Sequence, residues 1–202
     1  MIFFLFFFSI ACGAQTADVV FVLDSSSSEG SANFQKQVDF VKDFVKRYKI
    51  GPHNIQVGLV TFSTSAHNEF YFKSYHEQAS LLAKLNSIPY HSGSTHTDKG
   101  LQYARLFHTS GSSYGRRYNA SQIVVVLTDG QSTSPTNTIS QAKRLHATGA
   151  KVFAIGIGNN VNSHELHNIA DNPHHVFQVS GFDALNGIQY ELNQAACACM
   201  YL

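Results

Sequence analysis

Residues 18–28 read DVVFVLDSSSS, and this stretch decides the fold class. Its first part, residues 19–23, is an apolar run that does not alternate with polar residues. A continuous run of Val, Phe and Leu is typical of a strand that is buried on both faces, as in a parallel sheet covered by helices. Polar residues begin abruptly at Asp24. The stretch therefore predicts a buried parallel strand followed by a loop rich in hydroxyl groups.

Further apolar runs of the same character follow along the chain. They lie at residues 57–62, 123–127 and 152–157. A short run at residues 69–72 follows the first of these closely, which predicts an antiparallel edge strand after a hairpin. The chain is thus expected to form a mostly parallel sheet with one antiparallel edge.

Helical patterns separate the predicted strands. One apolar stripe has spacings of three and four residues: Phe34, Val38, Val41, Phe44, Val45 and Tyr48. A second helix starts at Ser134 and Pro135 and ends before Gly149. Weaker patterns predict helices at residues 76–86, 99–107, 164–170 and 183–194. Strands that alternate with helices predict an α/β fold, an open doubly wound sheet with helices on both faces and a Rossmann-like architecture.

Length and composition restrict the function classes. The chain has 202 residues, and we expect one domain over residues 17–196. Hydrophobic residues make up 44% and charged residues 13%, which excludes a disordered chain. The net charge of +1 excludes nucleic-acid binding by a basic surface and a polybasic membrane patch.

The two ends of the chain carry separate signals. Residues 2–11 are apolar or small and too few to span a membrane as a helix, so residues 1–14 are predicted to be a signal peptide. A lipoprotein signal at Cys12 is the rival interpretation. A secreted chain enters an oxidising environment, where Cys197 and Cys199 in the short tail at residues 197–202 would be oxidised. Because a bridge between such close neighbours is strained, we expect a disulfide-linked oligomer or a partner segment outside this sequence, with two free thiols as the alternative.

Candidate metal ligands follow the predicted strands. Asp24, Ser26 and Ser28 alternate directly after the first strand, so a curled loop can direct all three at one point. Asp129 follows the strand at 123–127, and Thr95 belongs to a third loop. Carboxylate and hydroxyl oxygens are hard ligands that suit Mg²⁺ or Mn²⁺. Taken singly, the aspartate is equally explained as a helix cap and the serines as an ordinary loop.

In these residues the chain resembles the von Willebrand factor type A domain family. Its metal-ion-dependent adhesion site has the pattern Asp-x-Ser-x-Ser, a distant Thr, and an Asp in a Thr-Asp-Gly turn, which here correspond to Asp24, Ser26, Ser28, Thr95 and Asp129. Further motifs occur in the family's order: VGLVTFS at 57–63, GSTHTDKGL at 93–101, VVVLTDGQS at 124–132 and AIGIG at 154–158.

The resemblance implies a function and also shows two departures. Members of the family bind an acidic group of a protein ligand through the metal, and this chain looks most like domains of collagen VI, matrilins and related invertebrate matrix proteins. It therefore implies a secreted, non-enzymatic adhesion module of the extracellular matrix, with collagen as the first ligand to test. Asp98 stands where many relatives carry Gly, and the cysteine that often precedes the first strand is missing, which puts the anchoring of the tail in doubt.

Several alternatives stay open or are excluded. A structural matrix protein that assembles through Cys197 and Cys199, or a recognition domain of a larger receptor or enzyme, are the competing functions. Gly156 and Gly158 lack the third glycine of a dinucleotide-binding loop. No zinc motif joins the histidines between residues 164 and 175, which we expect to face solvent.

Three local expectations concern single positions near the predicted site and one surface loop. Thr97 is expected to cap the helix that follows it. The loop at residues 110–117 is expected to border the metal. Asn119 begins an Asn-Ala-Ser sequon for glycosylation.

Overall fold

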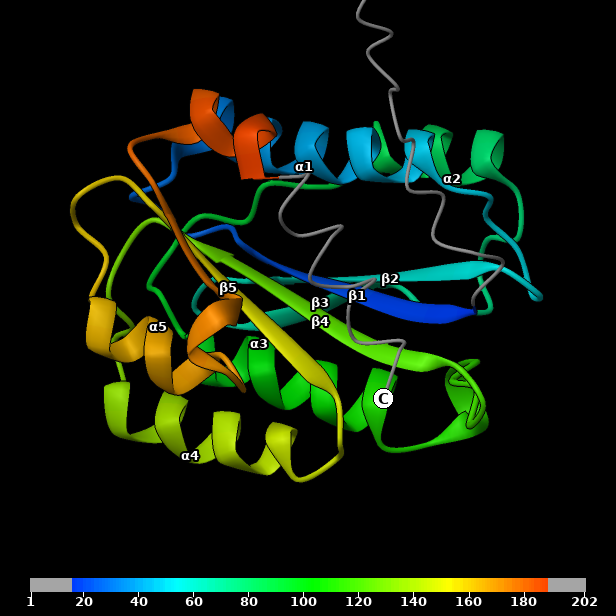
Figure 1. Ribbon diagram of the computed structural model, residues 1–202. Coiled ribbons are helices and arrows are strands. Elements are labelled where there is room, and N and C mark those ends of the chain that lie inside the picture. Colours follow the sequence, from blue (N-terminus) through cyan, green and yellow to red (C-terminus); the bar gives the residue numbers. More distant parts are fainter. Residues whose placement is uncertain (1–15, 189–202) are drawn as a thin grey trace, which may run out of the picture.

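A mostly parallel sheet forms the central layer of the fold (Figure 1). The structure is a computed structural model that describes residues 16–188, and within that range six strands pair in the order β3-β2-β1-β4-β5-β6. The strands are β1 (Ala17–Asp24), β2 (Ile55–Phe62), β3 (Ala66–Phe70), β4 (Ser121–Thr128), β5 (Lys151–Ile157) and β6 (Val176–Val179). Every neighbouring pair is parallel except β2 and β3. The predicted fold class is confirmed.

The two outer strands differ from what their sequences suggested. The edge strand β3 begins at Ala66, three residues earlier than predicted, because the turn is only three residues long and Ser63 donates a backbone hydrogen bond to Ser65. At the other edge, β6 was not predicted at all. Its four residues, VFQV, are too few to show a period, and only pairing with β5 makes them a strand.

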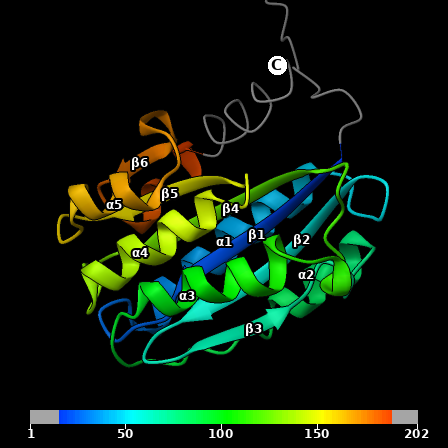
Figure 2. The same cartoon turned by 90° about the horizontal axis from the view of Figure 1, so that it is seen from below.

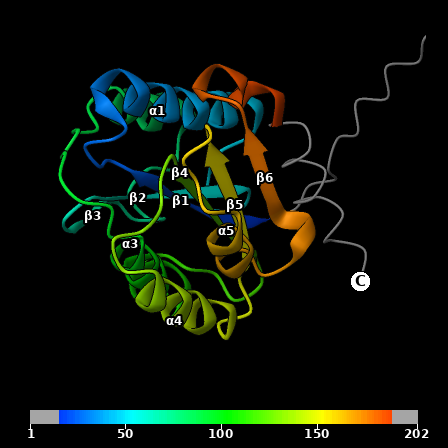
Figure 3. The same ribbon diagram turned by 90° about the vertical axis from the view of Figure 1, so that its left-hand side faces the viewer.

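Helices cover both faces of the sheet (Figures 1 and 3). The helices α1 (Gly30–Arg47) and α2 (Gln78–Leu85) lie on one face, together with the 3₁₀ turn at Phe182–Ile188. The helices α3 (Thr97–Tyr103), α4 (Pro135–His146) and α5 (Ser163–Ile169) lie on the other, as the view from below shows (Figure 2). After Tyr103, α3 continues as a π-helix over Ala104–Thr109. The expected helix at 183–194 is therefore a 3₁₀ turn as far as residue 188, and its remainder lies outside the described residues.

Two apolar clusters, one on each face, explain why the strand sequences do not alternate. Phe21 and Leu23 of β1 belong to the cluster beneath α1, whereas Val20 and Val22 belong to the cluster beneath α3 and α4. All four side chains are fully buried. Because both faces of β1 are covered, apolar residues are favoured at every position of the strand.

A close contact places α3 against the sheet. A Cβ atom at Gly100 would come within 2.8 Å of the Phe62 ring and 2.9 Å of Val22, so only glycine allows the helix to approach this near. The start of α3 is thereby held beside the carboxyl ends of β1 and β2. This edge of the sheet faces the viewer in Figure 3.

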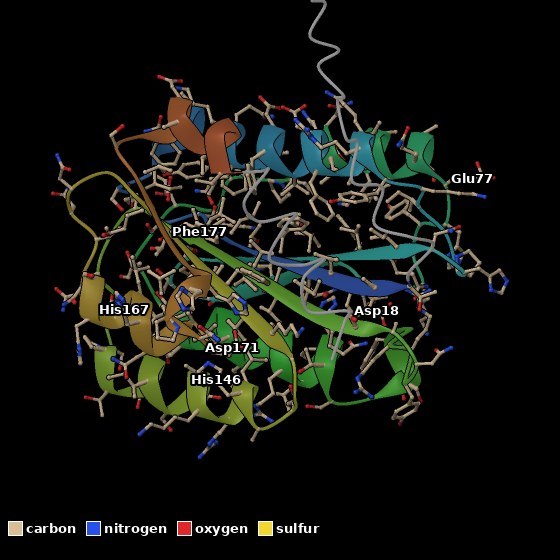
Figure 4. The ribbon with its side chains drawn as sticks, viewed as in Figure 1. Asp18, Glu77, His146, His167, Asp171 and Phe177 are labelled. Atoms are coloured by element: carbon tan, nitrogen blue, oxygen red, sulfur yellow. The ribbon has the colours of Figure 1, made fainter. Side chains whose placement is uncertain are left out.

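The opposite ends of the strands, their amino ends, hold a buried ion pair. Asp18, at the start of β1, is fully buried and lies at the right-hand end of the sheet in Figure 4. Arg117 approaches it with a guanidinium nitrogen at 2.8 Å. The expectation that the loop at 110–117 borders the metal site is therefore wrong, because the pair with Asp18 fixes this loop at the amino end of β1.

The predicted signal peptide at residues 1–14 and the cysteine-containing tail at residues 197–202 lie outside the described residues. Among the helices that the structure describes, none combines the length and apolar character needed to cross a membrane.

Candidate metal centre

The candidate site lies between β1 and β4, where the order in which the strands are added to the sheet reverses. From β1 the chain runs through α1 to β2 on one side, whereas β4 pairs with β1 on the other side. Loops that leave β1 and β4 therefore diverge to opposite faces and open a crevice at the carboxyl ends of the strands, which is the usual ligand position in such sheets. Asp24 ends β1, and Asp129 directly follows β4.

Hydrogen bonds hold Asp24 from three directions. The backbone N–H of Ser26 donates to Oδ1 at 2.9 Å, and the hydroxyl of Thr128 donates to Oδ2 at 2.7 Å. The amide of Gln37, on α1, donates to the main-chain oxygen of Asp24 at 2.9 Å. The carboxylate is fully buried, so its orientation is determined before any ligand arrives. Thr128 has a role that the sequence analysis missed.

Ser26, Ser28 and Asp129 form a continuous chain of polar contacts. The hydroxyl oxygens of Ser26 and Ser28 lie 3.0 Å apart, and Ser28 donates to Oδ1 of Asp129 at 2.9 Å. Together with the bond from Ser26 to Asp24, these contacts bring four of the five predicted ligands into one cluster. Because the two aspartates leave adjacent strands, the sheet itself positions the cluster.

The two intervening serines bind the loop that precedes α3. The hydroxyl of Ser25 accepts a hydrogen bond from the backbone N–H of His91 at 2.7 Å. The hydroxyl of Ser27 accepts one from the N–H of Gly93 at 2.9 Å, and its own N–H donates to the carbonyl of Gly93 at 2.8 Å. Gly93 has a φ of +111°, which other residues adopt only with strain. Ser25 and Ser27 therefore face the loop before α3 and not the cluster.

Thr95 reaches this edge through its backbone. Its N–H donates to the hydroxyl of Thr133 at 3.1 Å, and its carbonyl accepts from the N–H of Thr133 at 2.8 Å. The carbonyl also accepts from the hydroxyl of Ser132 at 3.3 Å, and Glu165 of α5 accepts from the N–H of Ser132 at 3.1 Å. The loop of Thr95 is thus attached to the loop after β4. Within residues 16–188, no hydrogen bond joins the Thr95 hydroxyl to the other four predicted ligands.

A third carboxylate, Glu29, belongs to the same cluster. One oxygen of Glu29 lies within 4.8 Å of an oxygen of Asp24 and an oxygen of Asp129. Glu29 is 2% exposed, and neither of its carboxylate oxygens has a hydrogen-bond partner. Glu29 was not among the predicted ligands, although its position directly after Ser28 was the available signal.

The surroundings oppose negative charge on all three acids. Burial raises the pKa of Asp24 to about 6, although hydrogen bonds from Ser26 and Thr128 lower it. Burial, followed by the charges of Asp24 and Asp129, raises the pKa of Glu29 to about 10, although the nearby Gln37 side chain and Asp129 backbone lower it. Burial also raises the pKa of Asp129. A divalent cation among these oxygens would reverse the effect, because it favours the charged form of each carboxylate. The donor set, carboxylates and hydroxyls, fits a hard divalent cation.

The start of α3 differs from expectation at one residue. His96 occupies the cap position of α3, and Thr97 is the first helical residue, with a buried hydroxyl that has no partner. The prediction that Thr97 caps the helix is therefore wrong. Asp98, where many relatives carry Gly, contacts His96, with its Oδ1 lying 3.3 Å from Nδ1 of the imidazole.

The histidines late in the chain lie apart from the cluster. His164, His167 and His174 are exposed as expected, but His175 is buried. Its Nδ1 lies 2.7 Å from Oδ1 of Asp171, which is labelled in Figure 4 beside the end of α5. The expectation of a solvent-facing side chain is wrong for His175, because the ring packs on Phe153 with centroids 4.1 Å apart.

Comparison with known sequences identifies the family. A family model described as von Willebrand factor type A domain matches residues 18–191. The collagen alpha-4(VI) chain of Mus musculus is 33% identical over 187 residues, which are 93% of this chain and 8% of that protein. Matrilin-1 of Homo sapiens is 32% identical over 187 residues, which are 92% of this chain and 37% of that protein.

Solved structures agree with these matches. Proximal thread matrix protein 1 from the mussel byssus, described "with zinc occupied MIDAS motif", superposes with a TM-score of 0.83 at 33% identity. The match covers 92% of this chain and 46% of that one, and the chain spans less than half the length of each relative described here. The chain belongs to the von Willebrand factor type A domain family.

Proposed function

We propose that this chain is a secreted, non-enzymatic adhesion module that binds an acidic group of a protein ligand through a divalent metal. The observation that carries the proposal is the hydrogen-bonded cluster of Asp24, Ser26, Ser28 and Asp129 at the ends of two adjacent strands. Ligands of open α/β sheets bind in the crevice at such a switch point. The metal ligands in this proposal are these four residues and Thr95.

The chemistry of the cluster supports Mg²⁺ or Mn²⁺ as the cation. Both prefer oxygen ligands and retain exchangeable water, so a bound cation supplies a Lewis acid to which a carboxylate of the partner can bind. The chain's own residues would hold that cation: Thr128 orients the Asp24 carboxylate, Gln37 holds the backbone of Asp24, and Ser28 orients Asp129. The zinc named for the mussel protein makes Zn²⁺ a third cation to test.

The relatives suggest where the ligand occurs. A collagen chain, a matrilin and a byssus matrix protein are similar to this chain over more than nine-tenths of its length. We infer an extracellular matrix location, and collagen is the first protein ligand to test. Asn119 is exposed in the loop before β4, which agrees with glycosylation of a secreted protein.

The similarity to the mussel matrix protein also favours a second candidate function. In this alternative the chain is a structural matrix component that assembles through its own surfaces and through Cys197 and Cys199, independently of metal. Because the chain spans less than half of each relative, a recognition domain of a larger protein is compatible with both candidates.

Binding to immobilised collagen tests the first candidate. The full chain is measured in Mg²⁺, in EDTA and as the Asp24→Ala variant, with circular dichroism to verify folding. The matched control is Glu77→Ala, which removes an exposed carboxylate at the opposite end of the sheet (Figure 4). We expect binding in Mg²⁺ by the wild type and the control, and loss of at least tenfold in EDTA and in Asp24→Ala.

Three outcomes separate the candidates. Binding that survives both EDTA and Asp24→Ala contradicts metal-mediated adhesion. Oligomers that dissociate only under reducing conditions on electrophoresis support assembly through Cys197 and Cys199. Absence of binding in every condition removes collagen as the ligand.

A further inference from the structure

Glu29 is an acid at a helix start that does not act as a helix cap. It directly precedes α1, with a φ of −61° and a ψ of −47°, and its side chain accepts no hydrogen bond from the helix backbone. Acidic residues near a helix start usually stabilise it through the free N–H groups or the helix dipole. A fully buried side chain that forms no cap bond requires a different explanation.

The isolation of the Glu29 carboxylate is energetically unfavourable. Both oxygens are buried, and neither has a hydrogen-bond partner. Burying a polar group without a partner costs free energy, and burying an ionised carboxylate costs far more. The nearest charged groups are Asp24 and Asp129, which carry the same sign, with one oxygen of each of the three acids within 4.8 Å of the others. No arginine, lysine or histidine forms an ion pair with any of the three within residues 16–188.

We propose that Glu29 supplies a third carboxylate to the cation site of Asp24 and Asp129. This inference rests on the proposed metal site and adds a residue outside the five-residue motif. With two carboxylates, a divalent cation forms a neutral centre. With Glu29 ionised as well, the centre carries one negative charge, so the protein holds the cation more tightly.

The position of Glu29 in the sequence, directly after Ser28, supports this role. Glu29 is covalently next to Ser28, whose hydroxyl already contacts Asp129, and α1 fixes the backbone on its other side. The carboxylate is therefore placed before any cation binds, which lowers the entropy cost of ligation. A rival explanation is a neutral glutamic acid whose only role is packing. The two explanations differ in what an uncharged side chain of the same shape does to cation affinity.

The test compares Glu29→Gln with the wild type by titration of the full chain with MnCl₂ in a calorimeter, without any protein ligand. We expect at least tenfold weaker Mn²⁺ binding for Glu29→Gln. Thermal unfolding of both proteins in EDTA verifies that Glu29→Gln is folded. Mn²⁺ affinity within twofold of the wild type overturns the proposal.

Two further variants make the result specific. Glu69→Gln removes a carboxylate that is also buried but has partners. Oε1 of Glu69 accepts a hydrogen bond from the Thr61 hydroxyl at 2.8 Å, and Oε2 lies 4.0 Å from Nζ of Lys84. It should keep wild-type Mn²⁺ affinity, and an equal loss there contradicts a particular role for Glu29. Asp24→Ala should abolish Mn²⁺ binding. If Asp24→Ala binds normally, the proposed metal function fails too, whereas loss in Asp24→Ala with normal binding by Glu29→Gln refutes the role of Glu29 alone.

Discussion

His108 shows how strongly burial controls a single ionisable residue. Its side chain is fully buried against the ring of Phe72, with centroids 5.0 Å apart. Nε2 lies 2.7 Å from Oδ1 of Asn68, whereas Nδ1 has no partner. A Cβ atom at Gly58 would come within 2.5 Å of the imidazole, so no space remains for water beside it on that side. Burial lowers the pKa of His108 to about 3.

We expect this histidine to make the fold sensitive to acid. Its pKa is below the unfolded value of 6.5, so the unfolded chain takes up the proton first, and stability is lost as pH falls from 6.5 toward 3. Between pH 7 and pH 5 the wild type should lose about 2 kcal/mol of unfolding free energy more than His108→Gln. Urea denaturation at both pH values measures the difference.

The control for this prediction is His53→Gln, which removes an exposed histidine. It should follow the wild type at both pH values. Equal pH dependence in His108→Gln and the wild type would contradict the prediction.

At the scale of elements, one loop joins the starts of two strands. The guanidinium of Arg117 donates to Asp18 and to the carbonyl of Ala17 in β1, at 2.8 Å each. It also donates to the carbonyls of Pro52 at 2.7 Å and Asn54 at 2.9 Å, just before β2. One side chain thus satisfies a buried carboxylate and three backbone oxygens.

Replacing this arginine should destabilise the whole fold. Arg117→Ala leaves Asp18 buried with only Gln122 and a backbone N–H as donors, so we expect a loss of about 3 kcal/mol in urea denaturation. Arg116→Ala is the matched control. Arg116 stacks on the exposed Tyr118 ring at 4.8 Å, and its loss should cost less than about 1 kcal/mol.

The same variant separates stability from binding. Arg117 lies at the opposite end of the strands from the candidate metal centre, so the folded Arg117→Ala protein should bind Mn²⁺ with wild-type affinity. A large change in affinity would indicate that the two ends of the sheet are coupled.

At the scale of the whole molecule, the candidate site is assembled from segments far apart in sequence. Asp24 and Asp129 are brought together because β1 and β4 pair in parallel and end at the same edge. The loop of Thr95 joins them through the chain segment after β4. An unfolded chain cannot hold these groups together, so a cation that binds them stabilises only the folded state.

Cation binding should therefore raise the unfolding temperature. At a Mn²⁺ concentration about 100 times the dissociation constant, the expected stabilisation is about 2.7 kcal/mol. For a domain of this size that corresponds to an increase of roughly 5–10 °C over EDTA in a thermal scan. Asp129→Asn should abolish most of the increase. Identical unfolding temperatures of the wild type in Mn²⁺ and EDTA would contradict a folded-state cation site.

The sequence alone determined the central strands, and it predicted four residues that the structure brings together at the candidate site. The apolar run of β1 reports burial on both faces at every position, and the change at Asp24 marks the end of the strand. Since parallel strands end at one edge, Asp24 and Asp129 could be placed together without coordinates. These features are readable because each depends on local pattern and on a general rule of sheet geometry.

Only the tertiary structure decided the features that depend on packing between distant segments. Glu29 is an ordinary surface residue type in the sequence, and only the fold buries it beside Asp24 at the end of β1 and Asp129 after β4. Arg117 holds the loop at 110–117 at the amino ends of the strands, because it pairs with Asp18, ninety-nine residues away in the sequence. The lowered pKa of His108 and the pairing of β6 with β5 also depend on distant segments. Burial and strand pairing are determined by neighbours in space, which a local sequence pattern does not contain.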